Sequence, residues 1–299
     1  PESTTHVVCY RLRFGMYDAL GGRTGLEGVT ATDPTSFRGD FSTLHHLGLE
    51  VRAAVRGILN RHPNAEIALL GHSRGGLAAR AFSQKTSPER AKVVAMVTTG
   101  TPHRGSPLGR IYKYLRNHPR PNPATDWRVV DFLNGKTNCS NVIRIKNPDP
   151  LDVRRPTIDD LSSDSVGIRD LNRDIGSLPR TIKYGELRYP LLRLGVLADI
   201  PPQYSVFDRR DLSDICVQLT TAAEQTIVGS GHTADDYPGD GMVPEASQRY
   251  FNIPRFPAPL ANRFSRQGRS FTVHTKEPEQ STDIDAILTD MMGAWWTTP

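Results

Sequence analysis

The sequence predicts an α/β fold: a doubly wound, mostly parallel sheet with a loop-rich insertion that forms a lid or cap. Two observations carry this prediction. First, amphipathic helical patterns alternate with short apolar runs between residues 43 and 97, as in sheets that are covered by helices on both faces. Second, residues 106–235 are rich in Pro, Asp, Arg and Asn and contain few long apolar segments. We therefore interpret 106–235 as an insertion folded over the core.

The most regular part of the chain predicts two helices and two strands in alternation. Residues 43–61 carry apolar side chains every three or four positions with charged ones between them, which predicts an amphipathic helix. The apolar run 66–70 predicts a buried strand that leads into the glycine-rich turn 71–76. A second helix is expected over 77–84 and a second buried strand over 93–97.

Outside this region the pattern is weaker. We expect strands at 5–11, 181–187 and 270–273, and a helix at 283–295 near the end of the chain. The apolar stretch 189–197 is either a helix of a moving lid or part of a rigid insertion. The sequence contains no internal repeat.

Length, composition and charge are those of a globular protein. The 299 residues allow one large domain or two small ones. The net charge is +5, but the basic residues are spread along the whole chain, so nucleic-acid binding is not expected. No apolar run approaches the roughly 20 residues that span a bilayer.

The three cysteines, Cys9, Cys139 and Cys216, have no metal-binding spacing. Two alternatives stay open: a disulfide between Cys139 and Cys216, or three core thiols. Because the sequence has neither Met at position 1 nor a signal-peptide pattern, it is interpreted as a processed form or a fragment, and the compartment is left open.

Gly71-His72-Ser73-Arg74-Gly75 has the G-x-S-x-G pattern of a nucleophile elbow, at the junction of a predicted strand and a predicted helix. In such a turn the serine has strained backbone geometry, and side chains two positions away on either side would clash with the backbone. Glycine removes this clash. The helix that follows points its N–H groups at the place where an oxyanion develops. A glycine-rich turn with an ordinary serine is the alternative.

A serine hydroxyl needs a base and an orienting carboxylate before it becomes a nucleophile. In α/β-hydrolases these follow the serine in the order acid, histidine. Asp240 is the best acid candidate, because the glycines on both sides of it make a sharp loop that can push the carboxylate into a site. A plain β-turn is the alternative, and Asp235 and Asp236 are the other acids considered.

His274 is the best candidate for the base. It follows the predicted strand 270–273, and loops at the carboxyl ends of strands carry the sites of open α/β sheets. His103 lies too soon after the second strand to satisfy the chain order, and His232 precedes Asp240. Since Ser73 and His274 must meet across most of the chain, we predict one domain over residues 1–299.

The chain resembles the bacterial triacylglycerol lipase branch of the α/β-hydrolases, which includes lipases related to inositol deacylases. The elbow at 71–76 and the segment Thr99-Gly100-Thr101-Pro102-His103-Arg104-Gly105-Ser106 carry the resemblance. Gly-Asp-Gly-Met-Val-Pro around Asp240 and the histidine at 274 are similar to the segments with the family's catalytic acid and base. The close match covers 43–110, with shorter matches at 239–244 and 270–295.

The resemblance implies a serine carboxyl-ester hydrolase, a lipase or esterase that works through an acyl-enzyme. Ser73 would be the nucleophile, His274 the base, Asp240 the acid and the Arg74 N–H one oxyanion donor. The substrate would be an acyl ester or lipid, met at a lipid interface, with no cofactor and with oligomeric state left open. Acyl transfer and polyester depolymerisation by the same triad are alternatives, as is a non-catalytic interaction module. The resemblance favours a secreted or extracytoplasmic location.

Two features depart from the family. The His-Gly pair that supplies the other oxyanion donor is absent before Ser73. Either the strands that hold it lie upstream of residue 1, or the glycine-rich loop after Arg11 replaces it. Several such lipases also hold calcium through an aspartate two residues after the catalytic histidine. Here that residue is Lys276, so a calcium site is not expected.

Overall fold

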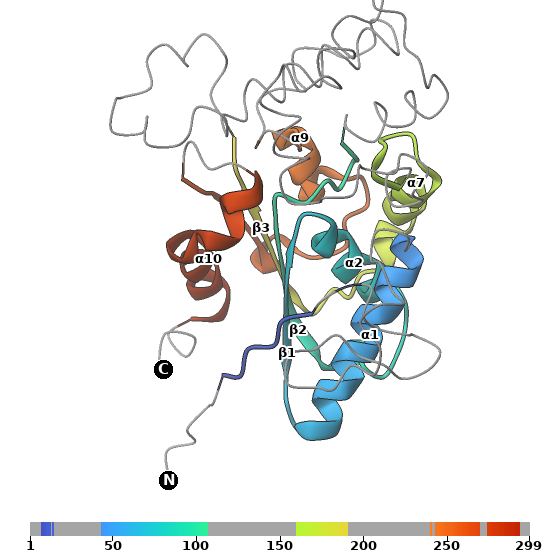
Figure 1. Cartoon of the computed structure of the whole chain (residues 1–299), viewed down its shortest axis with the longest axis vertical. Coiled ribbons are helices and arrows are strands. Elements are labelled where there is room, and N and C mark those ends of the chain that lie inside the picture. The colour runs from blue at the N-terminus through green and yellow to red at the C-terminus, as the bar shows by residue number, and fades with distance from the viewer. Residues whose placement is uncertain are drawn as a thin grey trace, which may run out of the picture.

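The structure is a computed structural model. It describes residues 7–12, 14, 43–106, 160–190, 240, 243–269 and 274–293. In this part of the chain, four strands form one parallel sheet in the order β1-β2-β3-β4. They are β1 (Ile67–His72), β2 (Val93–Thr99), β3 (Lys183–Arg188) and β4 (Arg263–Gln267). Figure 1 shows the sheet with helices on both sides. The predicted α/β class, with a parallel sheet covered by helices, is therefore confirmed.

One face of the sheet is covered by the two helices of the regular region. They are α1 (Leu44–Arg61) and α2 (Arg74–Ser83), which pack on each other, with α2 next to β1 (Figure 1). The helices approach closely at Gly48, where an added Cβ would lie 3.0 Å from the Cβ of Ala81. This face holds the larger buried apolar cluster, which extends to Tyr184 and Tyr250.

The other face is covered by α10 (Ser281–Met292), which packs on β3 and β4. Four of its apolar residues are buried against strand residues of β2 and β3: Ile287, Leu288, Met291 and Met292. The shorter elements are α7 (Val166–Arg173), α9 (Glu245–Gln248) and the 3-10 helices η2 (Arg90–Lys92), η3 (Asp174–Ser177), η8 (Tyr250–Asn252), η9 (Leu260–Asn262) and η10 (His274–Glu279).

β3 is a strand of the main sheet, although it falls within 106–235. The adjoining α7 is also tied to the core, because Arg80 of α2 donates hydrogen bonds to Leu171 O at 2.7 Å and to Asn172 Oδ1 at 2.9 Å. Residues 160–190 therefore belong to the core rather than to a cap. The extent of a cap on either side stays a prediction, because 107–159 and 191–239 lie outside the described residues.

Most predicted elements of the regular region are present with shifted ends. The first helix and first two strands are α1, β1 and β2, and α2 begins at Arg74 rather than at residue 77. The strand expected at 181–187 is β3, and the last helix is α10.

Two predicted strands have a different outcome. Residues 7–11 are not in a strand, and the side chain of Val8 is 57% exposed. The predicted strand is therefore wrong for residues 7–11, which pair with no strand in the described part of the chain. Residues 270–273 lie outside the described residues, and the fourth strand is β4, which we did not predict. β4 is largely polar and exposed, so it lacks the apolar pattern of a buried strand.

Cys9 is exposed with a free thiol, whereas Cys139 and Cys216 lie outside the described residues. No helix in the described ranges is long and apolar enough to cross a bilayer.

The start of α1 offers a test of local stability. The Thr43 hydroxyl accepts a hydrogen bond from the backbone N–H of His46 at 3.2 Å. Thr43→Ala should therefore lower the free energy of unfolding by about 1 kcal/mol in urea denaturation. Thr43→Ser keeps the capping oxygen and should stay close to wild type. Equal losses in the two variants would contradict the capping role.

Candidate active site

Ser73 occupies the sharp turn between β1 and α2. Its backbone has φ 54° and ψ −128°, a left-handed conformation that non-glycine residues rarely adopt. Two backbone hydrogen bonds hold it: Ser73 N–H donates to Thr99 O at 2.9 Å, and Gly76 N–H donates to Ser73 O at 3.0 Å. The serine is thereby placed at the carboxyl ends of the neighbouring parallel strands β1 and β2, where open α/β sheets carry their sites.

Close packing around this turn explains two of its glycines. A Cβ on Gly71 would lie 2.6 Å from the backbone of Gly76, and a Cβ on Gly76 would lie 2.0 Å from Thr101 Oγ1. Among the described residues, a Cβ on Gly75 would meet only the ring of Phe14, at 3.7 Å. Our explanation of the motif therefore holds for Gly71 but is wrong for Gly75, because the second crowded position is Gly76.

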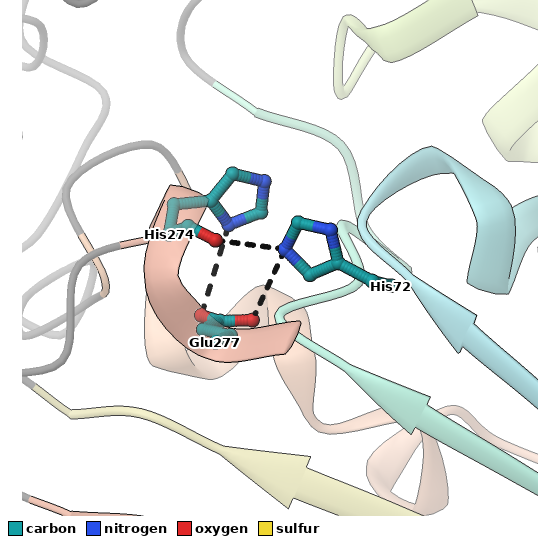
Figure 2. Close-up of side chains that lie close together, drawn as sticks. All are labelled: His72, His274 and Glu277. Carbon is teal, nitrogen blue, oxygen red and sulfur yellow. Dashed lines mark hydrogen bonds and ion pairs between the residues drawn. The ribbon is translucent and has the colours of Figure 1, made fainter. Parts of the chain in front are cut away.

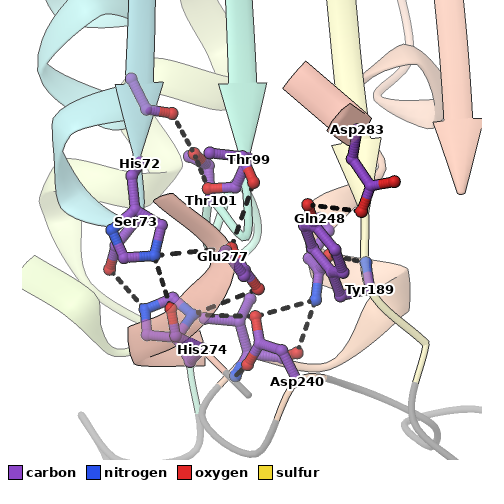
Figure 3. Close-up of polar contacts among 12 residues, drawn as sticks. His72, Ser73, Thr99, Thr101, Tyr189, Asp240, Gln248, His274, Glu277 and Asp283 are labelled. Carbon is purple, nitrogen blue, oxygen red and sulfur yellow. Dashed lines mark hydrogen bonds and ion pairs between the residues drawn. The ribbon is translucent and has the colours of Figure 1, made fainter. Parts of the chain in front are cut away.

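His274 and Asp240 converge on Ser73 from distant parts of the chain (Figure 3). His274 Nε2 lies 2.7 Å from Ser73 Oγ, and His274 Nδ1 lies 2.9 Å from Asp240 Oδ2. The His274 backbone N–H also donates to Asp240 O at 2.9 Å. The structure thus brings together the three side chains that the sequence analysis selected.

The carboxylate of Asp240 is completely buried and is held by donors other than the histidine. Val243 N–H donates to its Oδ1 at 2.7 Å, and Gln248 Nε2 donates to its Oδ2 at 3.0 Å. Gln248 was missed in the sequence analysis, because a glutamine eight residues from an aspartate carries no recognised pattern. These bonds fix which oxygen of Asp240 faces the imidazole.

The other candidates are not part of this arrangement. His103 is buried, with Nδ1 accepting from Arg80 at 3.2 Å and Nε2 lying 3.2 Å from Thr98 Oγ1. Burial, together with the nearby guanidinium, holds the pKa of His103 well below its ordinary value. It is therefore a neutral packed residue, stacked on Tyr250. His232, Asp235 and Asp236 lie outside the described residues.

Glu277 is a further acidic residue at the site that the sequence analysis missed. It is completely buried. Its Oε2 lies 3.4 Å from His72 Nε2 and its Oε1 lies 3.7 Å from His274 Nδ1 (Figure 2). Its place three residues after the candidate histidine, on the same short helix, was the one signal that could have identified it.

Two buried carboxylates beside one imidazole change the proton affinities of all three groups. Burial disfavours a charged imidazole, but the negative charges of Asp240 and Glu277 outweigh it and raise the pKa of His274. Burial raises the pKa of Asp240, and Glu277 raises it further against the opposing effect of His274. Glu277 has its pKa lowered, because its interactions with His274 and His72 outweigh burial.

His72, His274 and Glu277 are residue types that bind metals, and among the described residues they form a group with ligand atoms within 4.8 Å of one another. Calcium prefers sites made of oxygen ligands, so this set with two imidazoles does not suit it. His72 Nε2 faces the carbonyl oxygen of His274 at 2.8 Å. Since a carbonyl can only accept, Nε2 carries a proton and is not free to bind a cation.

The first turn of α2 lies beside Ser73. Arg74 is the first residue of that helix, so its N–H belongs to the positive end of the helix dipole. The Phe14 ring lies near Gly75, so the chain reaches this turn at Phe14. Residues 15–42, with the glycine-rich loop, lie outside the described residues.

A family model matches part of the chain. Residues 37–145 match the PGAP1-like alpha/beta domain. The PGAP1-like segment contains the elbow, β1, α2 and β2, and together with the parallel sheet it supports the predicted resemblance to lipase-like α/β-hydrolases. It spans less than half of the chain and includes neither Asp240 nor His274.

Solved structures similar to this chain include three bacterial proteins. The mature form of Bacillus licheniformis lipase BlEst2 has 14% identity over 86% of this chain and 77% of its own, with a TM-score of 0.49. EstA from Clostridium botulinum has 14% identity over 75% of this chain and 64% of its own, with a TM-score of 0.41. Staphylococcus hyicus lipase has 12% identity over 78% of this chain and 70% of its own, with a TM-score of 0.41. No curated protein matches the sequence.

The glycines of the elbow give a matched set of variants. Gly71→Ala and Gly76→Ala place a Cβ within 2.6 Å of neighbouring atoms and should lower the free energy of unfolding by about 1–3 kcal/mol. Gly75→Ala adds only an ordinary contact in a helix, so its stability should stay within about 1 kcal/mol of wild type. Urea denaturation measures all three. A larger loss at Gly75 than at Gly76 would contradict the geometry described here.

Proposed function

We propose that the protein is a serine carboxyl-ester hydrolase of the lipase or esterase type. The observation that supports it most is the continuous chain of contacts from Ser73 Oγ through His274 to Asp240, with separations of 2.7 and 2.9 Å. A nucleophile, a base within hydrogen-bond reach and a carboxylate that orients the base are what acyl transfer to serine requires.

In the proposed reaction, Ser73 Oγ attacks the ester carbonyl while His274 Nε2 takes the serine proton. Asp240, beside Nδ1, orients the imidazole and stabilises its positive charge. His274 then protonates the leaving alcohol, which leaves the acyl group on Ser73. Water, deprotonated by His274, releases the acid in a second step of the same kind. No cofactor or metal ion is needed.

The negative oxygen of the tetrahedral intermediate would be stabilised by the Arg74 N–H at the start of α2. The glycine-rich loop after Arg11 is the proposed source of the other donor, because Phe14, near its start, has its ring beside Gly75. A cap from within 106–235 would cover the acyl group of an ester or lipid substrate. Tyr189 is not part of that cap, since it is completely buried in the core.

Covalent labelling tests the nucleophile directly. A fluorophosphonate should label wild type, and p-nitrophenyl esters should be turned over. Ser73→Ala should abolish labelling, and His274→Ala should slow labelling and turnover by about 10⁴ or more.

His62→Ala is the matched control, because this histidine is exposed and contacts Tyr10. It should behave as wild type. Folded wild-type protein that neither labels nor turns over esters would overturn the hydrolase proposal and leave a non-catalytic module.

The pH dependence follows from the raised pKa of His274. Only the neutral imidazole accepts the serine proton, and a raised pKa means that this form appears at higher pH. The acidic limb of kcat/KM should therefore have its midpoint above about 6.5, the ordinary histidine value. Rates measured from about pH 5 to about pH 10 test this, with return to neutral pH as a control for inactivation. A midpoint at or below the ordinary value would contradict the two-carboxylate environment.

A further inference from the structure

Glu277 lies beside the same ring nitrogen of His274 as Asp240 does, yet the reaction proposed above has no step for it. We propose that Glu277 is a second carboxylate for His274, a positioning residue that shares with Asp240 the stabilisation of the imidazolium and that His72 holds in place. This inference rests on the proposed function, and the experiments below separate the two.

The first support is a buried oxygen that accepts no hydrogen bond. Glu277 Oε1 is buried with no hydrogen-bond partner among the described residues, and it lies 3.7 Å from His274 Nδ1. Leaving a buried carboxylate oxygen without a donor is costly. Attraction to a positive imidazole offsets that cost, and the positive charge forms on His274 during the reaction.

The second support is that the other oxygen is held by one hydrogen-bond donor and one imidazole neighbour. Thr99 Oγ1 donates to Glu277 Oε2 at 3.2 Å, and His72 Nε2 lies 3.4 Å from the same atom. Gly100 has φ +52°, and a Cβ there would lie 2.0 Å from Oε2. The end of β2 therefore leaves room for this carboxylate and holds it in one orientation.

His72 connects Glu277 to both the nucleophile and the base (Figures 2 and 3). It immediately precedes Ser73, its Nε2–H donates to the backbone O of His274 at 2.8 Å, and its ring lies 4.7 Å from that of His274. The elbow, the histidine loop and Glu277 are thus tied together by one side chain. The His72 position of the G-x-S-x-G motif acquires a role through these contacts.

The charges around Glu277 distinguish it from an ordinary buried glutamate. Glu89, for comparison, is paired with two guanidinium groups, those of Arg52 and Arg56. In the part of the chain that the structure describes, the basic groups paired with Glu277 are His72 and His274. Its negative charge therefore acts on the imidazoles of His274 and His72 and, as a like charge, on Asp240.

The direct measurement is a ¹⁵N-histidine NMR titration of His274, which does not depend on turnover. Glu277→Gln should lower the pKa of His274 by about 1–3 units, because an opposite charge within a few ångströms is removed. Glu279→Gln is the matched control: it removes the same charge from the same helix at an exposed position and should leave the titration unchanged. His274→Asn assigns the signals.

A second variant keeps the test decisive if Glu277→Gln does not fold. In Asp240→Asn the pKa of His274 should remain above about 6.5, the ordinary value, because Glu277 still faces the ring. A buried imidazole with no second carboxylate would instead titrate below that value, which would overturn the inference.

The rate of fluorophosphonate labelling gives the functional readout. The labelling rate of Asp240→Ala should fall by less than the roughly 10⁴-fold that is typical when a triad carboxylate is removed. The labelling rate of the double variant, Asp240→Ala with Glu277→Gln, should fall by about 10⁴-fold. Glu277→Gln alone should move the acidic limb of labelling to lower pH by the shift seen in the titration. Glu277→Asp keeps the negative charge on a shorter side chain. The acidic limb of its labelling profile should therefore lie closer to that of wild type than the limb of Glu277→Gln does.

The outcomes distinguish the two proposals. Wild type that labels normally, with a His274 titration unchanged in Glu277→Gln, overturns the second-carboxylate role and leaves the hydrolase intact. Wild type that does not label overturns the hydrolase, while the titration still decides whether Glu277 acts on His274. If Glu277 had only a packing role, Glu277→Asp would label more slowly than Glu277→Gln, and the pH profile would not shift.

Discussion

The strained turn at Ser73 is the constraint on which the rest of the site depends. A non-glycine residue with φ 54° costs about 1–3 kcal/mol and persists only where its surroundings leave no alternative. Here the bond from Ser73 N–H to Thr99 O joins the turn to the next strand, while Gly71 and Gly76 allow backbone and side chains to approach closely. The core on both sides of the sheet supplies the stability that keeps this turn in place.

The parallel sheet converts this local turn into a site. Because β1, β2 and β3 run in the same direction, their carboxyl ends lie at one edge, and the loops that follow them meet there. Asp240 and His274 join through side-chain and backbone contacts with each other, so the acid and the base reach Ser73 as one unit. Asp240 and His274 are both buried, which strengthens the charge interaction between them.

Local sequence patterns predicted what depends on local structure. The elbow followed from Gly71-His72-Ser73-Arg74-Gly75 between an apolar run and a helix, and Asp240 and His274 followed from their loops and their order. Glu277, Gln248 and β4 were missed because their roles arise from pairing across the chain. Thr99 and Glu277, for instance, are 178 positions apart. Gly76 rather than Gly75 is the crowded position for a similar reason, since Thr101 fills the space beside it.

The central claim is that Ser73 carries the acyl group, and trapping that intermediate tests it most directly. Protein mixed with a p-nitrophenyl ester and quenched in acid during turnover should gain the mass of one acyl group. Peptide mapping should place it on Ser73, and Ser73→Ala should gain none. Two results would contradict the account. In one, folded protein turns over the ester and the acyl group maps to another residue. In the other, an acyl-enzyme accumulates while Ser73 stays unmodified.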